Sequence, residues 1–84
     1  MEHELFLPTL PHWTFGNDWS GSCGALRFFI TTSEQTMLAE VWDEDVCREL
    51  AQVRDSAQFE VSQQGLEEMR AWLEDQAGTL GGLN

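Results

Sequence analysis

The residues with the strongest capacity for chemistry are carboxylates, and they concentrate in one stretch of the chain. Seven of the fifteen acidic residues lie between positions 40 and 60. They are Glu40, Asp43, Glu44, Asp45, Glu49, Asp55 and Glu60. Clustered carboxylates can bind a metal ion, work as a paired acid and base, or present negative charge to a basic partner.

The spacing of these residues does not match a metal-binding motif. The run Asp43–Asp45 lacks the D-x-D-x-D-G pattern of a calcium loop, and no glycine follows where such a loop must turn. His3 and His12 lie in the N-terminal segment, and Cys23 and Cys47 are far apart with no C-x-x-C motif. We therefore predict no metal site and no cofactor.

Catalytic patterns are equally weak. The stretch "SGSCG" (20–24) has Ser20 where a nucleophile elbow centred on Ser22 needs glycine, and no base stands near Cys23 in the sequence. The chain contains no lysine, so it has no G-x-x-x-x-G-K phosphate loop. Paired carboxylates need one buried acid, and no acid falls on an expected apolar face. We predict no catalytic residues and no enzymatic activity.

The charge of the chain narrows the class of partner. Fifteen acidic residues face four basic ones, all arginines, for a net charge of −11. Residues 40–75 carry eleven of the acids and three of the arginines. This charge disfavours direct binding to nucleic acid or to an anionic membrane, because the phosphates would repel it. A binding partner is expected to be basic.

The middle of the chain predicts a β-hairpin. Residues 25–31 and 36–42 alternate apolar and mixed side chains, with "TSEQ" (32–35) as the loop and Thr31 opposite Thr36. This register pairs Arg27 with Glu40 and gives the hairpin one apolar face. That face consists of Leu26, Phe28, Ile30, Met37, Ala39 and Val41.

Other elements are predicted around this hairpin. Strands are expected at 12–15 and 57–61, turns at 16–24, and either a short helix or an irregular segment at 43–56. Ser62 should cap a helix that runs to Ala77 and ends at Gly78. Its buried stripe would be Leu66, Met69 and Leu73, widened by Trp72.

These elements predict an α+β fold in one domain, residues 1–84. A small antiparallel sheet of three or four strands would pack on one face against the C-terminal helix. Residues 1–11 should be extended, because Pro8 and Pro11 argue against a helix, and 78–84 should form a flexible tail. The acidic start is unlike a signal peptide, no apolar run approaches about 20 residues, and a cytoplasmic location with reduced thiols is expected. A bridge between Cys23 and Cys47 stays open.

Three segments carry a resemblance to a known group of sequences. The strings "GNDWSGSCGALRFFI" (16–30), "LAEVW" (38–42) and "FEVSQQGLEEMRAWLEDQ" (59–76) resemble a family of short uncharacterised bacterial proteins found in gut anaerobes. In size and charge the chain is also similar to small acidic inhibitors of phages and mobile elements, such as anti-CRISPR proteins and DNA mimics. That likeness implies a role in occupying a basic nucleic-acid-binding surface.

Two functional hypotheses follow. The first is a small inhibitor or adaptor that binds a basic, nucleic-acid-binding protein through the seven acids of residues 40–60, with Trp42 as an exposed anchor. Carboxylates one helical turn apart, about 5–6 Å, approach the charge spacing of a DNA strand, about 3.4 Å. The alternative is a dimerisation module that uses Phe29, Leu38 and Trp42 on the sheet, with acidity serving only solubility.

Overall fold

The computed structural model describes residues 5–44, 46 and 48–79 of the chain. It contains an antiparallel sheet in the order β1-β2-β3-β4, a short N-terminal helix and a longer C-terminal helix. The elements are α1 (Leu10–Thr14), β1 (Trp19–Cys23), β2 (Leu26–Ser33), β3 (Thr36–Trp42), β4 (Asp55–Glu60) and α2 (Gln63–Thr79). The predicted α+β class is confirmed. No helix in the described part of the chain is long and apolar enough to span a membrane.

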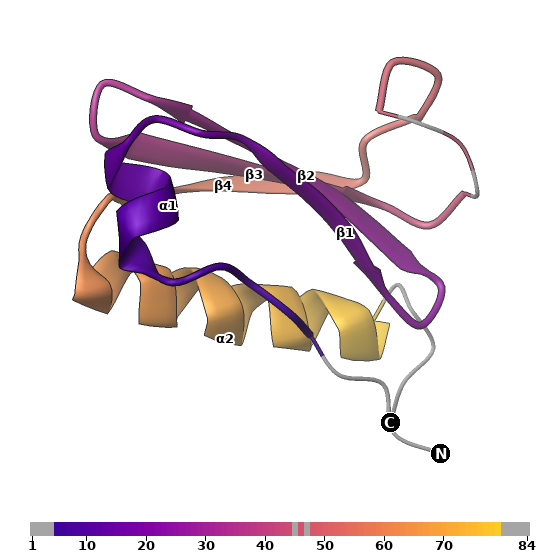
Figure 1. Ribbon diagram of the computed structural model, residues 1–84. Coiled ribbons are helices and arrows are strands. Elements are labelled where there is room, and N and C mark those ends of the chain that lie inside the picture. The colour runs from indigo at the N-terminus through magenta and orange to yellow at the C-terminus, as the bar shows by residue number, and fades with distance from the viewer. Residues whose placement is uncertain (1–4, 45, 47, 80–84) are drawn as a thin grey trace.

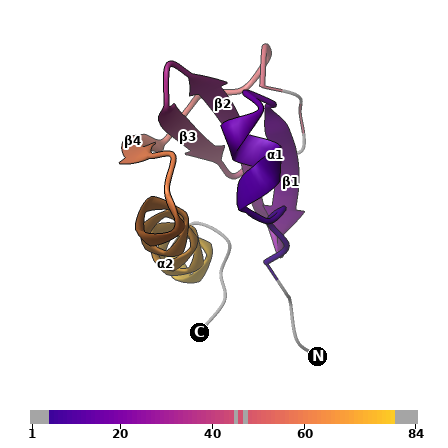
Figure 2. The ribbon, with the colours of Figure 1, turned by 60° about the vertical axis from the view of Figure 1, so that its left-hand side comes forward.

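The sheet and α2 form two layers (Figure 1). Seen along the helix, α2 lies beneath the β3–β4 half of the sheet, and α1 with the preceding segment lies beside the β1–β2 half (Figure 2). Leu5, Leu7 and Trp13 are buried in this N-terminal part. The N-terminal segment therefore completes the cover of the inner face that α2 leaves open.

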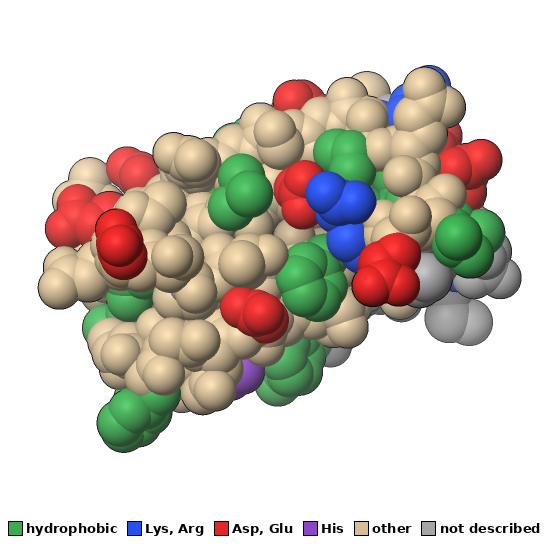
Figure 3. Space-filling view, turned by 90° about the horizontal axis from the view of Figure 1, so that it is seen from above, with side chains coloured by type: hydrophobic (Ala, Val, Ile, Leu, Met, Phe, Trp, Pro, Cys, Tyr) green, Lys and Arg blue, Asp and Glu red, His purple; other side chains and the backbone are tan. Residues whose placement is uncertain are grey.

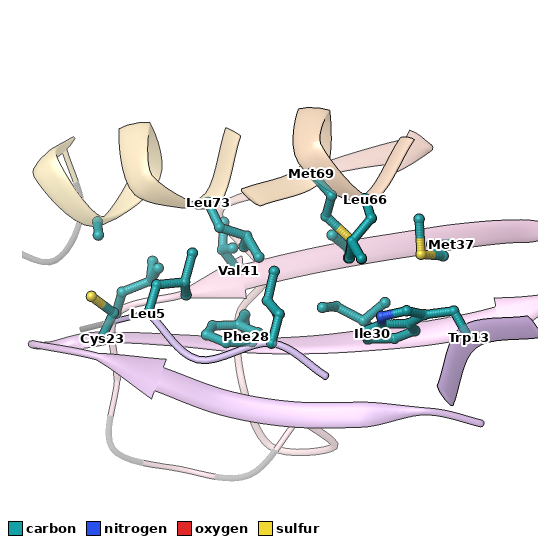
Figure 4. Packing of buried hydrophobic residues seen from close by; sticks show 14 residues of the cluster. Leu5, Trp13, Cys23, Phe28, Ile30, Met37, Val41, Leu66, Met69 and Leu73 are labelled. Carbon is teal, nitrogen blue, oxygen red and sulfur yellow. The ribbon is translucent and has the colours of Figure 1, made fainter. Parts of the chain in front are cut away.

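The core lies between these layers and follows the alternation of the two central strands. The inner side chains of β2 and β3 are almost completely buried, as predicted, and α2 contributes its apolar stripe from the other side (Figure 4). The strand residues are Leu26, Phe28, Ile30, Met37, Ala39 and Val41, and the helix residues are Leu66, Met69, Leu73 and Ala77.

The hairpin register differs from the prediction by two residues. Ser33 pairs with Thr36, so the turn contains only Glu34 and Gln35, at φ values of 50° and 66°. Positive φ at both central residues is typical of the type I′ turn, whose twist matches that of the flanking strands. A shift of two residues keeps each side chain on its face, which is why the core was predicted correctly. The predicted Arg27–Glu40 pairing is wrong, because Arg27 lies opposite Trp42.

The N-terminal third departs most from the prediction. Residues 10–14 are helical although Pro11 is among them, because a proline in the first helical turn loses no intrahelical hydrogen bond. Gly16, at φ 80°, ends this helix in the left-handed region. The predicted strand at 12–15 is therefore wrong. The predicted turn at 16–24 is confirmed at Gly16 and Gly24 and wrong over Trp19–Cys23, which forms β1.

The second half is closer to the prediction. Strand β4 overlaps the predicted strand, and Ser62 caps α2 as expected, with its Oγ accepting a hydrogen bond from the Gly65 N–H at 2.9 Å. The helix continues two residues beyond Ala77, so Gly78 lies inside it. Over the described residues of 43–54 the chain makes bends and a turn and no helix, which resolves the alternative left open there.

Candidate functional site

The sheet face opposite α2, here called the outer face, carries the side chains that alternate with the core. Figure 3 looks onto this side of the molecule and shows hydrophobic, basic and acidic side chains next to one another. The strand pairings place on this face Ser20, Ser22, Arg27, Phe29, Thr31, Leu38, Glu40, Trp42, Ser56, Gln58 and Glu60. It is a mixed polar and apolar surface.

The described residues of the segment between β3 and β4, 43–44, 46 and 48–54, fold back over one end of this face. At its base the Arg54 N–H donates a hydrogen bond to the Val41 carbonyl at 2.8 Å. The indole Nε1–H of Trp42 donates to the Val46 carbonyl at 2.9 Å. Trp42 is only 3% exposed, so the expectation of an exposed tryptophan among the acids is wrong. The indole holds the segment onto the sheet.

A charged pair fixes the same segment at a second point. Arg48 donates from Nε to Glu40 Oε1 at 2.8 Å and from Nη2 to Glu40 Oε2 at 2.7 Å. The hydrogen bond to Glu40 raises the pKa of the Arg48 guanidinium above its usual value. Two parallel hydrogen bonds fix the orientation of both groups, which a single contact would not do. Glu40 is therefore engaged within the chain.

A pocket of about 580 Å³ lies between this segment and the β1–β2 edge of the sheet. Its apolar walls come from Phe28, Phe29, Trp42 and Val46, and charged groups stand at its side. The full lining is Ser20, Gly21, Ser22, Arg27, Phe28, Phe29, Trp42, Val46, Arg48 and Glu49. Its size falls within the range of sites that bind small molecules or a large side chain.

Apart from Glu40, which Arg48 already binds, the described residues of the predicted site fall into two separate groups. Trp42 and Glu49 line the pocket, and Asp43 and Glu44 are exposed on the segment beside it. The Oδ1 of Asp43 lies 4.0 Å from Nη1 of Arg54. Glu44 accepts a hydrogen bond from the Gln52 N–H at 3.4 Å. Asp43, Glu44 and Glu49 together form an acidic rim beside the pocket.

The second group of predicted residues lies along β4. Asp55 begins the strand opposite Val41 and accepts a hydrogen bond from Gln76 Nε2 at 2.9 Å. Glu60 ends the strand at the hairpin turn, opposite Thr36, about 17 Å from Asp55 at the usual strand rise. Asp45 lies outside the described residues. The described acids therefore do not form one continuous row.

The arginines do not balance the remaining acids. Arg27 donates to the Gly24 carbonyl at 3.1 Å and Arg70 to the Leu5 carbonyl at 3.0 Å, so both are held by backbone oxygens. Eleven carboxylates in the described ranges are exposed. They are Asp18, Glu34, Asp43, Glu44, Glu49, Asp55, Glu60, Glu67, Glu68, Glu74 and Asp75.

No protein-family model, no curated protein and no solved structure matches the chain.

The residues of β1 are the part of the pocket that sequence reasoning missed. The sequence predicts turn residues at Ser20, Gly21 and Ser22, because serine and glycine favour turns. The sequence carries a weak signal of a strand, because Ser20 and Ser22 alternate with Trp19 and Cys23. Gly21 is required there because a Cβ would stand 2.7 Å from the ring of Phe28.

A metal site and a nucleophilic cysteine receive no support from the described residues. In the described ranges, no three His, Cys, Asp or Glu side chains gather as metal ligands. Cys23 is buried at the end of β1, and burial, with a smaller contribution from Glu74, raises the pKa of its thiol. A raised thiol pKa lowers the thiolate fraction near neutral pH, which opposes a nucleophilic role. Cys47 lies outside the described residues.

Proposed function

We propose that the chain is a small protein-binding inhibitor or adaptor whose acidic surface binds a basic protein. We favour a nucleic-acid-binding protein as the class of partner, because such proteins carry basic surfaces that bind anionic groups. The observation that carries the proposal is the imbalance at the surface. The described arginines contact acceptors within the chain, whereas eleven described carboxylates are exposed.

The acidic rim of the pocket is the part of this surface best suited to a defined partner. Asp43, Glu44 and Glu49 belong to a segment that the Glu40–Arg48 pair and the Trp42 indole hold against the sheet. A segment that is already ordered loses less conformational entropy on binding than a flexible one. The rim also borders apolar walls, so charge and apolar contact can act together.

Mimicry of a nucleic-acid backbone is the narrower form of this proposal. It would require several carboxylates to meet basic groups that normally hold successive phosphates. The separation of Asp55 and Glu60 along β4 favours two acidic areas over one strand-like row. Competition with nucleic acid for the partner would distinguish mimicry from binding elsewhere on the partner.

The alternative is a dimer formed through the outer face, and one observation favours it. Phe29 and Leu38 are only half-buried there, so they offer apolar contact to a second copy. The third member of the expected patch, Trp42, is already covered by residues 43–54. Light scattering at increasing protein concentration tests this form, and a mass that stays at one chain would exclude it.

The proposal is tested by capture from a bacterial lysate with the immobilised protein, at low salt and at about 0.5 M salt. At the higher salt concentration the Debye length falls well below ~8 Å. The test variant is Asp43→Asn/Glu44→Gln/Glu49→Gln, and the control is Glu67→Gln/Glu68→Gln/Asp75→Asn on α2. Both remove three negative charges. We expect a nucleic-acid-binding protein that is captured at low salt and released at high salt. Only the first variant should lose it.

Two results would contradict the proposal. Equal capture of the same proteins by both triple variants, whether it is retained or lost, would mean that the acidic rim does not determine binding. Failure to capture any salt-sensitive protein at low salt would contradict binding to a basic partner.

A further inference from the structure

Strand β1 is an edge strand with an open side. It pairs with β2 along Trp19–Cys23, and over Trp19–Ser22 no other described segment forms backbone hydrogen bonds to it. Alternate residues of such a strand direct their N–H and C=O groups away from the sheet. Ser20 and Ser22 are exposed on its outer face. Over Trp19–Ser22 the strand therefore offers unpaired backbone groups beside small side chains.

The two edges of the sheet are protected to different degrees. The opposite edge, β4, carries Asp55 at its start and Glu60 at its end. β1 contains no charged residue and no proline. Proteins commonly protect exposed edges with charges, prolines or bulges, because an open edge can pair with another chain. The absence of these features from β1 favours a strand-pairing role for this edge.

The pocket opens directly onto this edge. Ser20, Gly21 and Ser22 form its β1 side, and Phe29 and Trp42 form its apolar interior. A strand added beside β1 would lie about 4.8 Å away, with every second side chain on the outer face. A large side chain at the middle of the added strand could lean over the small serines into the pocket.

The charges around the pocket indicate which side chains it suits. Arg48 is satisfied by Glu40, and Arg27 donates to the Gly24 carbonyl, so the interior favours an apolar group. Glu49 lies at the rim of the pocket, and the net charge of the chain is −11. Basic residues two positions before and after the apolar residue would therefore find complementary charge.

The inner side of the same edge is also apolar. Phe6 is 66% exposed and its ring centroid lies 5.6 Å from that of Trp19. The intervening residues of an added strand would point to this side. Small aliphatic side chains there could contact Phe6.

We propose that the β1 edge binds an extended segment of the partner protein as an added strand, with an apolar side chain in the pocket and lysine or arginine at the flanking outer positions. The basic character of the segment rests on the proposed function. The inference that a strand binds at the β1 edge with an apolar side chain in the pocket does not depend on the proposed function.

The test uses four capped pentapeptides as probes, titrated into the 15N-labelled protein. They are Lys-Val-Phe-Val-Lys, Lys-Val-Ala-Val-Lys, Ser-Val-Phe-Val-Ser and Ser-Val-Ala-Val-Ser. The readouts are affinity from amide shifts and protection of the β1 amides from hydrogen exchange. We expect the first peptide to bind best and to protect β1 amides. Replacing its phenylalanine by alanine should weaken binding roughly tenfold or more, because a buried phenylalanine side chain is lost.

The four peptides separate failure of this inference from failure of the proposed function. Binding that needs phenylalanine but is the same with serine flanks would support the edge site and contradict the basic partner. Binding that needs lysine but not phenylalanine, without protection of β1, would overturn the edge site and leave the acidic surface supported. Absence of binding by all four peptides at low salt would overturn the edge site.

A pair of matched variants tests the location independently. Ser22→Phe would place a ring at the mouth of the pocket, whereas Ser56→Phe makes the same exposed change on the other edge strand. We expect Ser22→Phe to abolish the advantage of the phenylalanine peptide and Ser56→Phe to preserve it. Equal loss in both variants would overturn the assignment to β1.

Discussion

The carboxylate of Glu40 accepts two hydrogen bonds from the guanidinium of Arg48, at 2.8 Å from Nε and 2.7 Å from Nη2. Glu40 belongs to β3, and Arg48 belongs to the irregular segment that follows it. The pair therefore joins residues 43–54 to the outer face of the sheet. Together with the Trp42 indole, it shapes the pocket and holds the acidic rim in place.

Replacing Arg48 by lysine should loosen this segment without unfolding the protein. Lysine keeps the charge but cannot donate two parallel hydrogen bonds to one carboxylate. We expect faster amide hydrogen exchange over residues 48–54 and a nearly unchanged urea midpoint, because partly exposed ion pairs add little to global stability. Arg54→Lys is the control, since Arg54 only approaches Asp43 at 4.0 Å. Equal exchange in the two variants would contradict a positioning role for Arg48.

Gly65 should not tolerate alanine although it lies inside a helix. A Cβ at this position would stand 1.9 Å from the Glu60 carbonyl oxygen, where β4 passes into α2. Alanine normally stabilises a helix interior by about 1 kcal/mol over glycine. Here we expect the free energy of unfolding to fall by about 1–3 kcal/mol, because the backbone has to move. Urea denaturation measures the change, with Gln64→Ala as the exposed neighbour, and a gain in stability would refute the close contact.

Substitutions in the β2–β3 turn should raise the stability of the protein. Glu34 and Gln35 both have positive φ, which costs free energy for residues other than glycine and asparagine. Glu34→Asn/Gln35→Gly should raise the free energy of unfolding by about 1 kcal/mol, because these residues suit a type I′ turn. Thermal denaturation measures the gain. Glu34→Gln controls for loss of charge. An equal gain in stability from that single change would show that loss of charge, and not the turn conformation, causes the gain.

Cys23 predicts a pH dependence that can be isolated in this chain. Burial raises the pKa of its thiol, so its stabilising contribution is complete below the unfolded value, about 8.5, and is lost as pH rises through the higher folded value. The chain has no tyrosine and no lysine, so few other groups titrate there. In a Cys47→Ser background, thiolate absorbance at 240 nm should rise only above about pH 8.5 in the folded protein.

The stability of the same background should fall over that alkaline range. Urea midpoints at about pH 8 and about pH 10 measure the effect. A Cys23→Ala/Cys47→Ser variant should show a much smaller change between the two pH values. A native thiol that titrates at its ordinary pKa would contradict the burial effect.

The hairpin and the C-terminal helix were predictable because their signals are local. Alternation in β2 and β3 places each side chain on one face whatever the register, and the Ser62 cap begins the helix within its own first turn. The register itself was missed by two residues. It depends on a turn of non-glycine residues at positive φ, which Glu34 and Gln35 do not favour by themselves.

The candidate site was harder to predict because it combines distant segments. β1 consists mainly of serine and glycine, and pairing with β2 keeps it extended despite their preference for turns. The burial of Trp42 depends on a backbone carbonyl four positions later in an irregular segment. The acids were identified from the sequence, but their division between the pocket rim and the length of β4 was not.

The sequence alone determined the α+β class, the apolar face of the central hairpin, the capped helix and the excess of carboxylates. These properties follow from residue type and from periods of 2 and 3.6 residues, which act over short distances along the chain. Only the tertiary structure decided the edge position of β1, the cover over Trp42 and the pocket between them. Those features arise because side chains and backbone groups far apart in sequence satisfy one another in space, and no local pattern records such pairings.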